Sequence, residues 1–276
     1  MSGASMKQIK TRIKSVESTR QITKAMELVA TGKLRRAKER AEASRPFVRV
    51  LGQAIVGLTS AEEPSVFLQE REVRKSCYVV IAGDRGLAGG YNANLFRLVA
   101  EHLGTEDVVV PVGKKALEHY QRSGVCLLSS YFDVAAAVNM GDCVQLARLL
   151  CEGFSEGRFD RVVVAYTEFQ SILSQIPRLQ QLLPLQPEEE GERQGNALVE
   201  GEELVAKIVP QYLSGLLYAA VCEAAASEHG ARRTAMNSAN QNATELIDTL
   251  VLRYNRVRQA VITQEITEIV SGAEAL

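Results

Sequence analysis

The sequence predicts an α/β protein in which a long antiparallel coiled coil, made of the N- and C-terminal helices, accompanies a Rossmann-like head domain with an open sheet. Three observations predict this class. Apolar residues recur at helical spacing far beyond the length of an ordinary helix at both ends of the chain. Between the ends, short β-branched runs alternate with helical patterns. The 276 residues are enough for a sizeable core.

The first long helix is predicted over residues 6–57, with Ser5 and Gln8 spaced as a capping box at its start. At 1.5 Å per residue it would be roughly 75 Å long, too long for the inside of a compact head. Its apolar seam drifts around the helix, because the phase slips between three groups: Ile9, Ile13 and Val16; Ile22, Met26 and Val29; Leu34, Ala37 and Ala41.

The second long helix is predicted from Pro210, a favoured first helical residue, to about Gly272. The predicted division is therefore 1–57 for the first helix, 58–209 for the head and 210–276 for the second helix. Steps of three and four residues are mixed irregularly along the second seam, so a strongly left-handed supercoil is not specified. That seam comprises Leu213, Leu217, Ala220, Ala224, Ala239, Ala243, Leu246, Leu250, Tyr254, Val257 and Val261.

The head is predicted between residues 75 and 186, where the long helical pattern gives way to short alternating strand and helix patterns. Strand patterns cover 78–82, 108–112, 125–128 and 161–166, and helical patterns cover 93–103, 115–122 and 143–154. Residues 176–185 contain two prolines and suit an irregular edge strand. An acidic, apolar-poor stretch at 187–203 predicts an exposed connection to the second helix.

Charge is distributed unevenly although the net charge is only −1. Residues 6–49 contain thirteen Lys and Arg against four Asp and Glu, whereas residues 188–203 contain seven Glu and one Arg. Such asymmetry says more about partners than the total does. The five cysteines form no CxxC pair, which favours reduced, buried thiols. No apolar run approaches a membrane span and no targeting segment is evident, so we expect a soluble protein.

The stretch "GDRGLAGG", residues 83–90, follows a predicted strand and precedes a helical pattern, which is how many proteins hold a phosphate. It matches neither GxxxxGK[ST] nor GxGxxG, and no acidic residue ends the second strand. Tight strand–helix packing is therefore the favoured role of these glycines over a nucleotide site. Asp84 and Arg85 could pair with each other or with a partner.

No catalytic or metal-binding pattern appears elsewhere. His102, His119 and His229 are scattered and are expected to face solvent. The basic first helix has three interpretations: a solvated coiled-coil face, a nucleic-acid surface, or a surface for an acidic protein. The nucleic-acid interpretation is weakened because no aromatic residue precedes Pro46. A polar cluster at residues 237–242 fits an exposed face or a partner contact.

The two ends resemble a known family. "IKTRIKSVESTRQITKAMELVATGKLRRA" (9–37) and the segment 226–273, which ends in "ITQEITEIVSGA", closely resemble the γ subunits of rotary F-type ATP synthases. "GDRGLAGGYNAN" and "QIPRLQQLLPL" are similar to head segments of the same family. The resemblance covers nearly the whole chain. It implies a non-catalytic central rotor, without cofactor or metal, that couples proton-driven rotation of the membrane c-subunit ring to ATP synthesis and hydrolysis.

The partners implied by the resemblance are three α and three β subunits around the long helices, with ε and the c-ring at the head. No nucleic acid is implied, and membrane contact would occur only through the complex, at the cytoplasmic face of a bacterial membrane. Residues Arg258 and Gln259 match positions that engage a loop of one β subunit, with Thr263 and Glu265 in the same region.

Further contacts are implied nearer the head. Met26 and Arg232 match positions near the lower bearing of the rotor. Three basic residues, Lys33, Arg35 and Arg36, match positions that face an acidic helix-turn-helix lever of the β subunits. The apolar tip, residues 266–276, would turn inside a hydrophobic sleeve.

The sequence departs from the family at residues 196–202, "NALVEGE", where relatives usually have Tyr-x-Tyr-Glu-Pro. It also lacks the cysteine-bearing insertion of chloroplast γ subunits, so thiol control is not expected. Two other classes remain as alternatives: a Rossmann-like enzyme with helical extensions, and a coiled-coil scaffold for nucleic acid. Nucleotide titration tests the first, and salt-dependent DNA binding tests the second.

Overall fold

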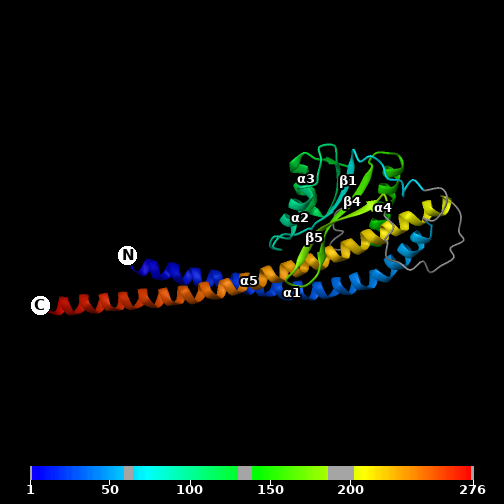
Figure 1. The fold of residues 1–276 in the computed structure, drawn as a ribbon. Helices are drawn as coiled ribbons and strands as arrows, with labels where there is room; N and C mark the ends of the chain where they lie inside the picture. The colour runs from blue at the N-terminus through cyan, green and yellow to red at the C-terminus, as the bar shows by residue number, and fades with distance from the viewer. Residues whose placement is uncertain (1, 59–64, 130–138, 186–201, 275–276) are drawn as a thin grey trace. The chain divides into compact units, whose positions relative to one another are not determined.

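The computed structural model describes residues 2–58, 65–129, 139–185 and 202–274. Its elements are α1 (Ser2–Leu58), β1 (Ser76–Ile81), α2 (Tyr91–Ala100), β2 (Val108–Val112), α3 (Lys114–Ser123), β3 (Cys126–Leu127), α4 (Met140–Ser155), β4 (Arg161–Phe169), β5 (Gln175–Leu183) and α5 (Glu202–Glu274) (Figure 1). The predicted fold class is confirmed, because both long helices and an open sheet are present.

Both long helices begin earlier than predicted. Helix α1 begins at Ser2, so Ser5 lies inside it and does not cap it. Helix α5 begins at Glu202, so Pro210 lies inside the helix and the end of the predicted connection, residues 202–203, is helical. The rest of that connection, with most of the "NALVEGE" segment, falls outside the described residues. Burial explains how the helix continues through Pro210, since Val209 and Leu213 on either side are fully buried in the head.

The sheet has the strand order β3-β2-β1-β4-β5. Strands β3, β2, β1 and β4 are parallel, and β5 joins the edge antiparallel to β4, as expected for the proline-containing segment. Central strand β1 is buried along its whole length, which explains its continuous apolar sequence.

Two cores lie on opposite faces of this sheet. Tyr78 and Val80 of β1 point to the face covered by α2 and α3. Cys77, Val79 and Ile81 alternate to the other face, which α4 and α5 cover (Figure 1). Helix α5 is therefore part of the core of the head as well as one of the two long helices.

The chain forms two compact units whose boundaries fall inside both long helices. One unit contains residues 31–232: the sheet, its helices and the adjoining parts of α1 and α5. Here the two helices run antiparallel, since Arg45 Nη2 lies 3.6 Å from Glu223 Oε1, and a Cβ at Gly215 would lie 3.0 Å from the Phe47 ring. A window of α5 reaches a mean hydropathy of 1.2 over a length that could span a membrane, but 56% of that window is buried in protein.

The other unit combines residues 2–30 of α1 with residues 233–274 of α5. Some positions, such as Met26 and Ala239, are half-buried out of step, but on each helix one set of buried and half-buried positions follows alternating steps of four and three, so the phase slips predicted for the first helix are wrong. On α1 they are Ile9, Ile13, Val16, Arg20, Thr23, Glu27 and Ala30; on α5 they are Met236, Asn240, Ala243, Ile247, Leu250, Tyr254, Val257 and Val261.

Three predicted seam residues face outward instead. Ile22, Val29 and Leu246 are 58%, 60% and 40% exposed, and their neighbours Thr23, Ala30 and Ile247 take the buried positions. One residue along a helix is a rotation of about 100°, so the seven-residue repeat buries the neighbour that is in phase, whether it is polar (Thr23), small (Ala30) or large and apolar (Ile247), over an apolar residue that is out of phase.

Candidate functional site

The carboxyl ends of β1 and β4 form the place where an open α/β sheet ordinarily binds a ligand. The chain leaves β1 toward β2 on one side and later returns to β4 on the other, so the strand order reverses beside β1. Ligands of such sheets lie in the crevice outside this reversal point. The glycine loop after β1, residues 82–90, occupies that position, and its surroundings decide whether a nucleotide site exists.

The start of the loop is fixed by backbone contacts with the next strand and helix. The Lys115 amide donates to the Gly83 carbonyl at 3.0 Å, and the Lys114 amide donates to Asp84 Oδ1 at 2.9 Å. Gly113 has a φ of +96°, and a Cβ there would overlap the carbonyl oxygen of Ala82. Glycine is thus required at residue 113 by both conformation and space.

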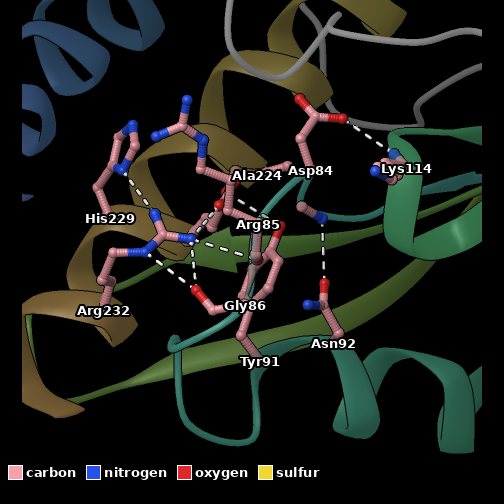
Figure 2. Close-up of polar contacts among 11 residues, drawn as sticks. Asp84, Arg85, Gly86, Tyr91, Asn92, Lys114, Ala224, His229 and Arg232 are labelled. Atoms are coloured by element: carbon pink, nitrogen blue, oxygen red, sulfur yellow. Dashed lines mark hydrogen bonds and ion pairs between the residues drawn. The ribbon is translucent and has the colours of Figure 1, made fainter.

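Helix α2 fixes the loop from its other end. Asn92, in the first turn of α2, accepts a hydrogen bond from the Gly83 amide at 3.0 Å (Figure 2). The hydroxyl of Tyr91 donates to the carbonyl oxygen of Ala224 on α5 at 3.1 Å. Burial raises the pKa of Tyr91 well above its usual range, so this hydroxyl stays neutral and acts as a structural donor.

Helix α5 fills the crevice with an ion pair. The Arg232 guanidinium bonds to the Glu228 carboxylate and donates to the Gly86 carbonyl oxygen, at 3.2 Å from Nη2 and 3.4 Å from Nε (Figure 2). It also donates to the Arg85 carbonyl oxygen at 3.4 Å. Glu228 lies so close to the loop that a Cβ on Gly83 would be 2.8 Å from its carboxyl carbon. The loop carbonyls and the crevice are therefore occupied by the protein's own side chains.

Burial sets the protonation of this cluster. The pKa of Glu228 is raised because burial outweighs the attraction of Arg232. The pKa of His229 is lowered to about 4, mainly by burial and then by Arg232 and Lys33. At neutral pH the His229 ring is thus uncharged, and its Nδ1 lies 3.2 Å from Arg232 Nη1.

These contacts correct two sequence predictions. His229 does not face solvent freely, since it is half-buried beside Arg232, whereas His102 and His119 are exposed as predicted. The question left open for Asp84 and Arg85 is answered within the chain for one oxygen of Asp84 alone, and pairing of the exposed Arg85 side chain stays a prediction. Asp84 receives the Lys114 amide, and the backbone carbonyl of Arg85 receives Arg232.

Three predicted contact residues on α1 are exposed in the head unit. Lys33, Arg35 and Arg36 all lie on the surface, and Arg35 makes a loose pair with Glu39 at 3.5 Å. An exposed pair of this kind restrains the side chain little. The predicted contact Arg232 is different, because 11% of its side chain is exposed and its guanidinium serves the cluster described above.

The remaining predicted contacts lie in the other unit. Arg258, Gln259, Thr263 and Glu265 are all exposed on α5, and Met26 is half-buried on α1. Figure 1 shows α5 running past the first residues of α1, and residues 262–271, here termed the α5 overhang, are exposed throughout. Large apolar residues are exposed there, with Ile262, Ile266 and Ile269 at 47%, 56% and 72%.

Sequence reasoning missed Glu228, Tyr91 and Asn92 as residues of the crevice. A Glu and an Arg four residues apart on a helix are usually a solvated pair, so their spacing gave no signal. One signal was available: the small residues 224–227 just before them indicate a helix face that another backbone approaches closely. Among the described residues, no group of three His, Cys, Asp or Glu could hold a metal ion.

Comparisons with known proteins agree over nearly the whole chain. A family model described as ATP synthase matches residues 5–276. The chain is 42% identical to an ATP synthase gamma chain, sodium ion specific, of Acetobacterium woodii, over 97% of each chain. It is also 42% identical to the ATP synthase gamma chain of Ruminococcus albus, over 98% of each.

Among solved structures, a chain of the Euglena gracilis mitochondrial ATP synthase, OSCP/F1/c-ring, in rotational state 3, has a TM-score of 0.75 with this chain. The match covers 99% of this chain and 95% of that chain at 21% sequence identity. The overall fold is thus shared with a solved protein.

Proposed function

The chain belongs to the family of ATP synthase gamma chains, and from that premise we propose that it is the central rotor of an F-type ATP synthase, coupling ion-driven rotation to ATP synthesis and hydrolysis. The observation that carries the proposal is the match over almost the full length of the chain and of its relatives. A subunit that keeps the whole length of a rotor keeps both the head and the long helices that rotation requires.

The occupied crevice supports a mechanical role over an enzymatic one. Where a Rossmann-like enzyme would bind its nucleotide, Arg232, Glu228 and Tyr91 link α5 to the glycine loop. A nucleotide would have to break a buried ion pair to enter, which costs several kcal/mol. We therefore assign the chemistry to partner subunits and the coupling to this chain, without cofactor or metal of its own.

Coupling requires that the rotor contact equivalent partners differently in each angular state. We propose that Arg258 and Gln259 contact one β subunit at a time, with Thr263 and Glu265 beside them. All four are exposed, so they are available to a partner. The exposed apolar residues of the α5 overhang fit a hydrophobic sleeve, because apolar contacts lack direction and permit sliding.

Nearer the head, we propose that Lys33, Arg35 and Arg36 face an acidic lever of the β subunits, with Met26 at the bearing. Arg232 belongs to the same region, and because its guanidinium holds the loop carbonyls, we propose that it acts by fixing the loop beside a partner.

The proposed complex contains three α and three β subunits, ε and the membrane c-ring, at the cytoplasmic face of a bacterial membrane. We propose H⁺ as the coupling ion, and Na⁺ is the competing ion because the Acetobacterium woodii relative is sodium ion specific. Because the ion binds in the membrane ring, dependence of synthesis on Na⁺ in vesicles containing the whole complex distinguishes the two.

The experiment that tests this function is co-expression of the tagged chain with the α, β and ε subunits of the same organism. We expect a complex of defined stoichiometry that hydrolyses ATP. Recovery of the chain alone would contradict the proposal. A calorimetric titration of the isolated chain with ATP, ADP and NAD tests the enzyme alternative, and stoichiometric micromolar binding would support that alternative instead.

A further inference from the structure

The tip of the β4–β5 hairpin presents large apolar side chains to solvent. Leu173 is 87% exposed, and Ile172 and Ile176 beside it are 38% and 39% exposed. Leu173 is the most exposed large apolar side chain among the described residues. Exposed apolar residues scattered singly are common, whereas here three lie within five residues of one turn. We call Ile172, Leu173 and Ile176 the hairpin knob.

The backbone beneath this knob is held by its own hydrogen bonds. The amides of Ser171 and Ser174 donate to each other's carbonyl oxygens at 3.0 and 3.3 Å. Ser171 Oγ accepts from the Leu173 and Ser174 amides, and Gln175 Nε2 donates to the carbonyl of Ile172 at 2.7 Å. The turn is therefore preorganised, and it offers a partner apolar side chains more than free backbone groups.

The base of the hairpin places the knob beside the basic segment of α1. The Phe169 ring packs against the cluster that Leu34 and Ala37 of α1 form with Ala225 and Ala226 of α5, and Lys38 Nζ lies 5.5 Å from its centroid. A Cβ on Gly230 of α5 would lie 3.1 Å from the same ring. The neighbouring positions on α1 carry Lys33, Arg35, Arg36 and Lys38, all exposed, with Glu39 as the one acidic residue among 33–39.

We infer that the hairpin knob docks into an apolar depression, edged by carboxylates, on a β subunit of the complex. The inference rests on the proposed function, since the partner must be a subunit that faces the rotor. Charge complementarity selects an acidic surface, because Lys38 lies at the base of the hairpin and the adjoining turn of α1 carries three more exposed cations. A second copy of this chain is disfavoured, since a two-fold contact would bring the same basic segments together.

A photo-crosslinking experiment on the assembled α, β and γ complex tests the inference. In a Cys126→Ser background, Leu173→Cys is labelled with a benzophenone maleimide; the other cysteines are buried. We expect light-dependent crosslinking to β, at a segment rich in Asp and Glu. The matched control carries the same probe on native Cys126, which is exposed on β3 at the opposite edge of the sheet, and should give no such product.

Affinity provides a second readout. Leu173→Asp places a carboxylate against the acidic surface and should weaken binding of the chain to the α/β ring by about tenfold or more, whereas Leu173→Met should bind like the wild type. An exposed tip residue does not alter folding, which circular dichroism checks.

Three results would overturn the inference: no β product in an intact complex, a product on a non-acidic segment, or equal affinity of Leu173→Asp and wild type. Binding to anionic phosphatidylglycerol vesicles that Leu173→Asp abolishes, without a β product, would assign the knob to lipid and also overturn it. If the wild-type chain fails to assemble with α and β, the proposed function fails and the inference falls with it.

Discussion

The guanidinium of Arg232 on α5 donates two hydrogen bonds to the carbonyl oxygen of Gly86, a residue 146 positions earlier in the chain. This contact joins a long helix to the loop at the reversal point of the sheet. Together with Glu228 it fills the crevice with side chains of the protein itself and ties residues 228–232 of α5 to the glycine loop.

Replacing Arg232 by Ala should destabilise the head strongly. The substitution leaves the Glu228 carboxylate buried without its cation, and removing one member of a buried pair costs about 3–5 kcal/mol. The measurement is urea unfolding of the purified chain. The double variant Arg232→Ala with Glu228→Gln is the control and should recover part of the loss. A double variant less stable than the single one would show that the pair is not the cause.

The pH dependence of stability should contain a component from His229. Its pKa falls from 6.5 to about 4 on folding, so between these values the unfolded state binds more protons and acid favours unfolding. We expect a loss of roughly 1–2 kcal/mol across this window, after allowance for solvent screening. The pKa of Glu228 is raised on folding, so the folded state holds this proton more tightly and acid favours folding at this group, opposite to the effect of His229.

His229→Gln isolates this component, because Gln can still accept from Arg232. The gap in unfolding free energy between the wild type and the variant is measured at pH 8 and at pH 5. At pH 5 the variant should be more stable relative to the wild type than it is at pH 8. A gap that is the same at both pH values would mean that His229 does not titrate differently in the folded state.

Gly113→Ala should be far more damaging than Gly124→Ala. Gly124 lies in the left-handed helical region, where a Cβ costs about 1–2 kcal/mol, whereas Gly113, with φ 96° and ψ 149°, lies in a region that is essentially restricted to glycine. A Cβ at Gly113 also overlaps the Ala82 carbonyl oxygen, whereas nothing lies within 4 Å of one at Gly124. Thermal unfolding of the two variants checks the order, and equal melting temperatures would refute the close approach of β1 and residue 113.

The double substitution of Arg258 and Gln259 by Ala should lower both ATP hydrolysis and ion-driven synthesis in an assembled complex. Ala sustains the helix, and the lost charge-assisted hydrogen bond is worth roughly 1.5–3 kcal/mol in one angular state. Arg122→Ala on α3 is the control for removing an exposed charge elsewhere. Normal rates in a complex of correct stoichiometry would remove these two residues from the mechanism.

Amide exchange in the α5 overhang should slow strongly when the chain assembles with α and β. Residues 262–271 are exposed, and a helix without packing partners is only marginally stable. Hydrogen exchange read by mass spectrometry compares the free and assembled chain, with residues 213–217 of the core as the internal reference. Equal protection of the overhang in both states would contradict the rotor arrangement.

The sequence by itself determined the elements of the head. Strand β2 and the predicted strand 108–112 coincide, and α3 differs from its prediction by one residue at each end. Strands buried on both faces and helices with one apolar face carry their signal within a few residues. The edge strand β5 was also predicted from sequence, because a proline within a strand pattern is typical of a sheet edge.

The tertiary structure decided which face of each long helix is buried and what lies at the crevice. Ile22 is more apolar than Thr23, yet Thr23 is buried, because the seam is selected by the partner helix along its whole length. Arg232 reads locally as a surface residue of a basic stretch, and only the approach of the Gly86 carbonyl makes it an interior one. The surroundings of such side chains are set by contacts with residues more than a hundred positions away in the sequence, so they cannot be predicted from local spacing.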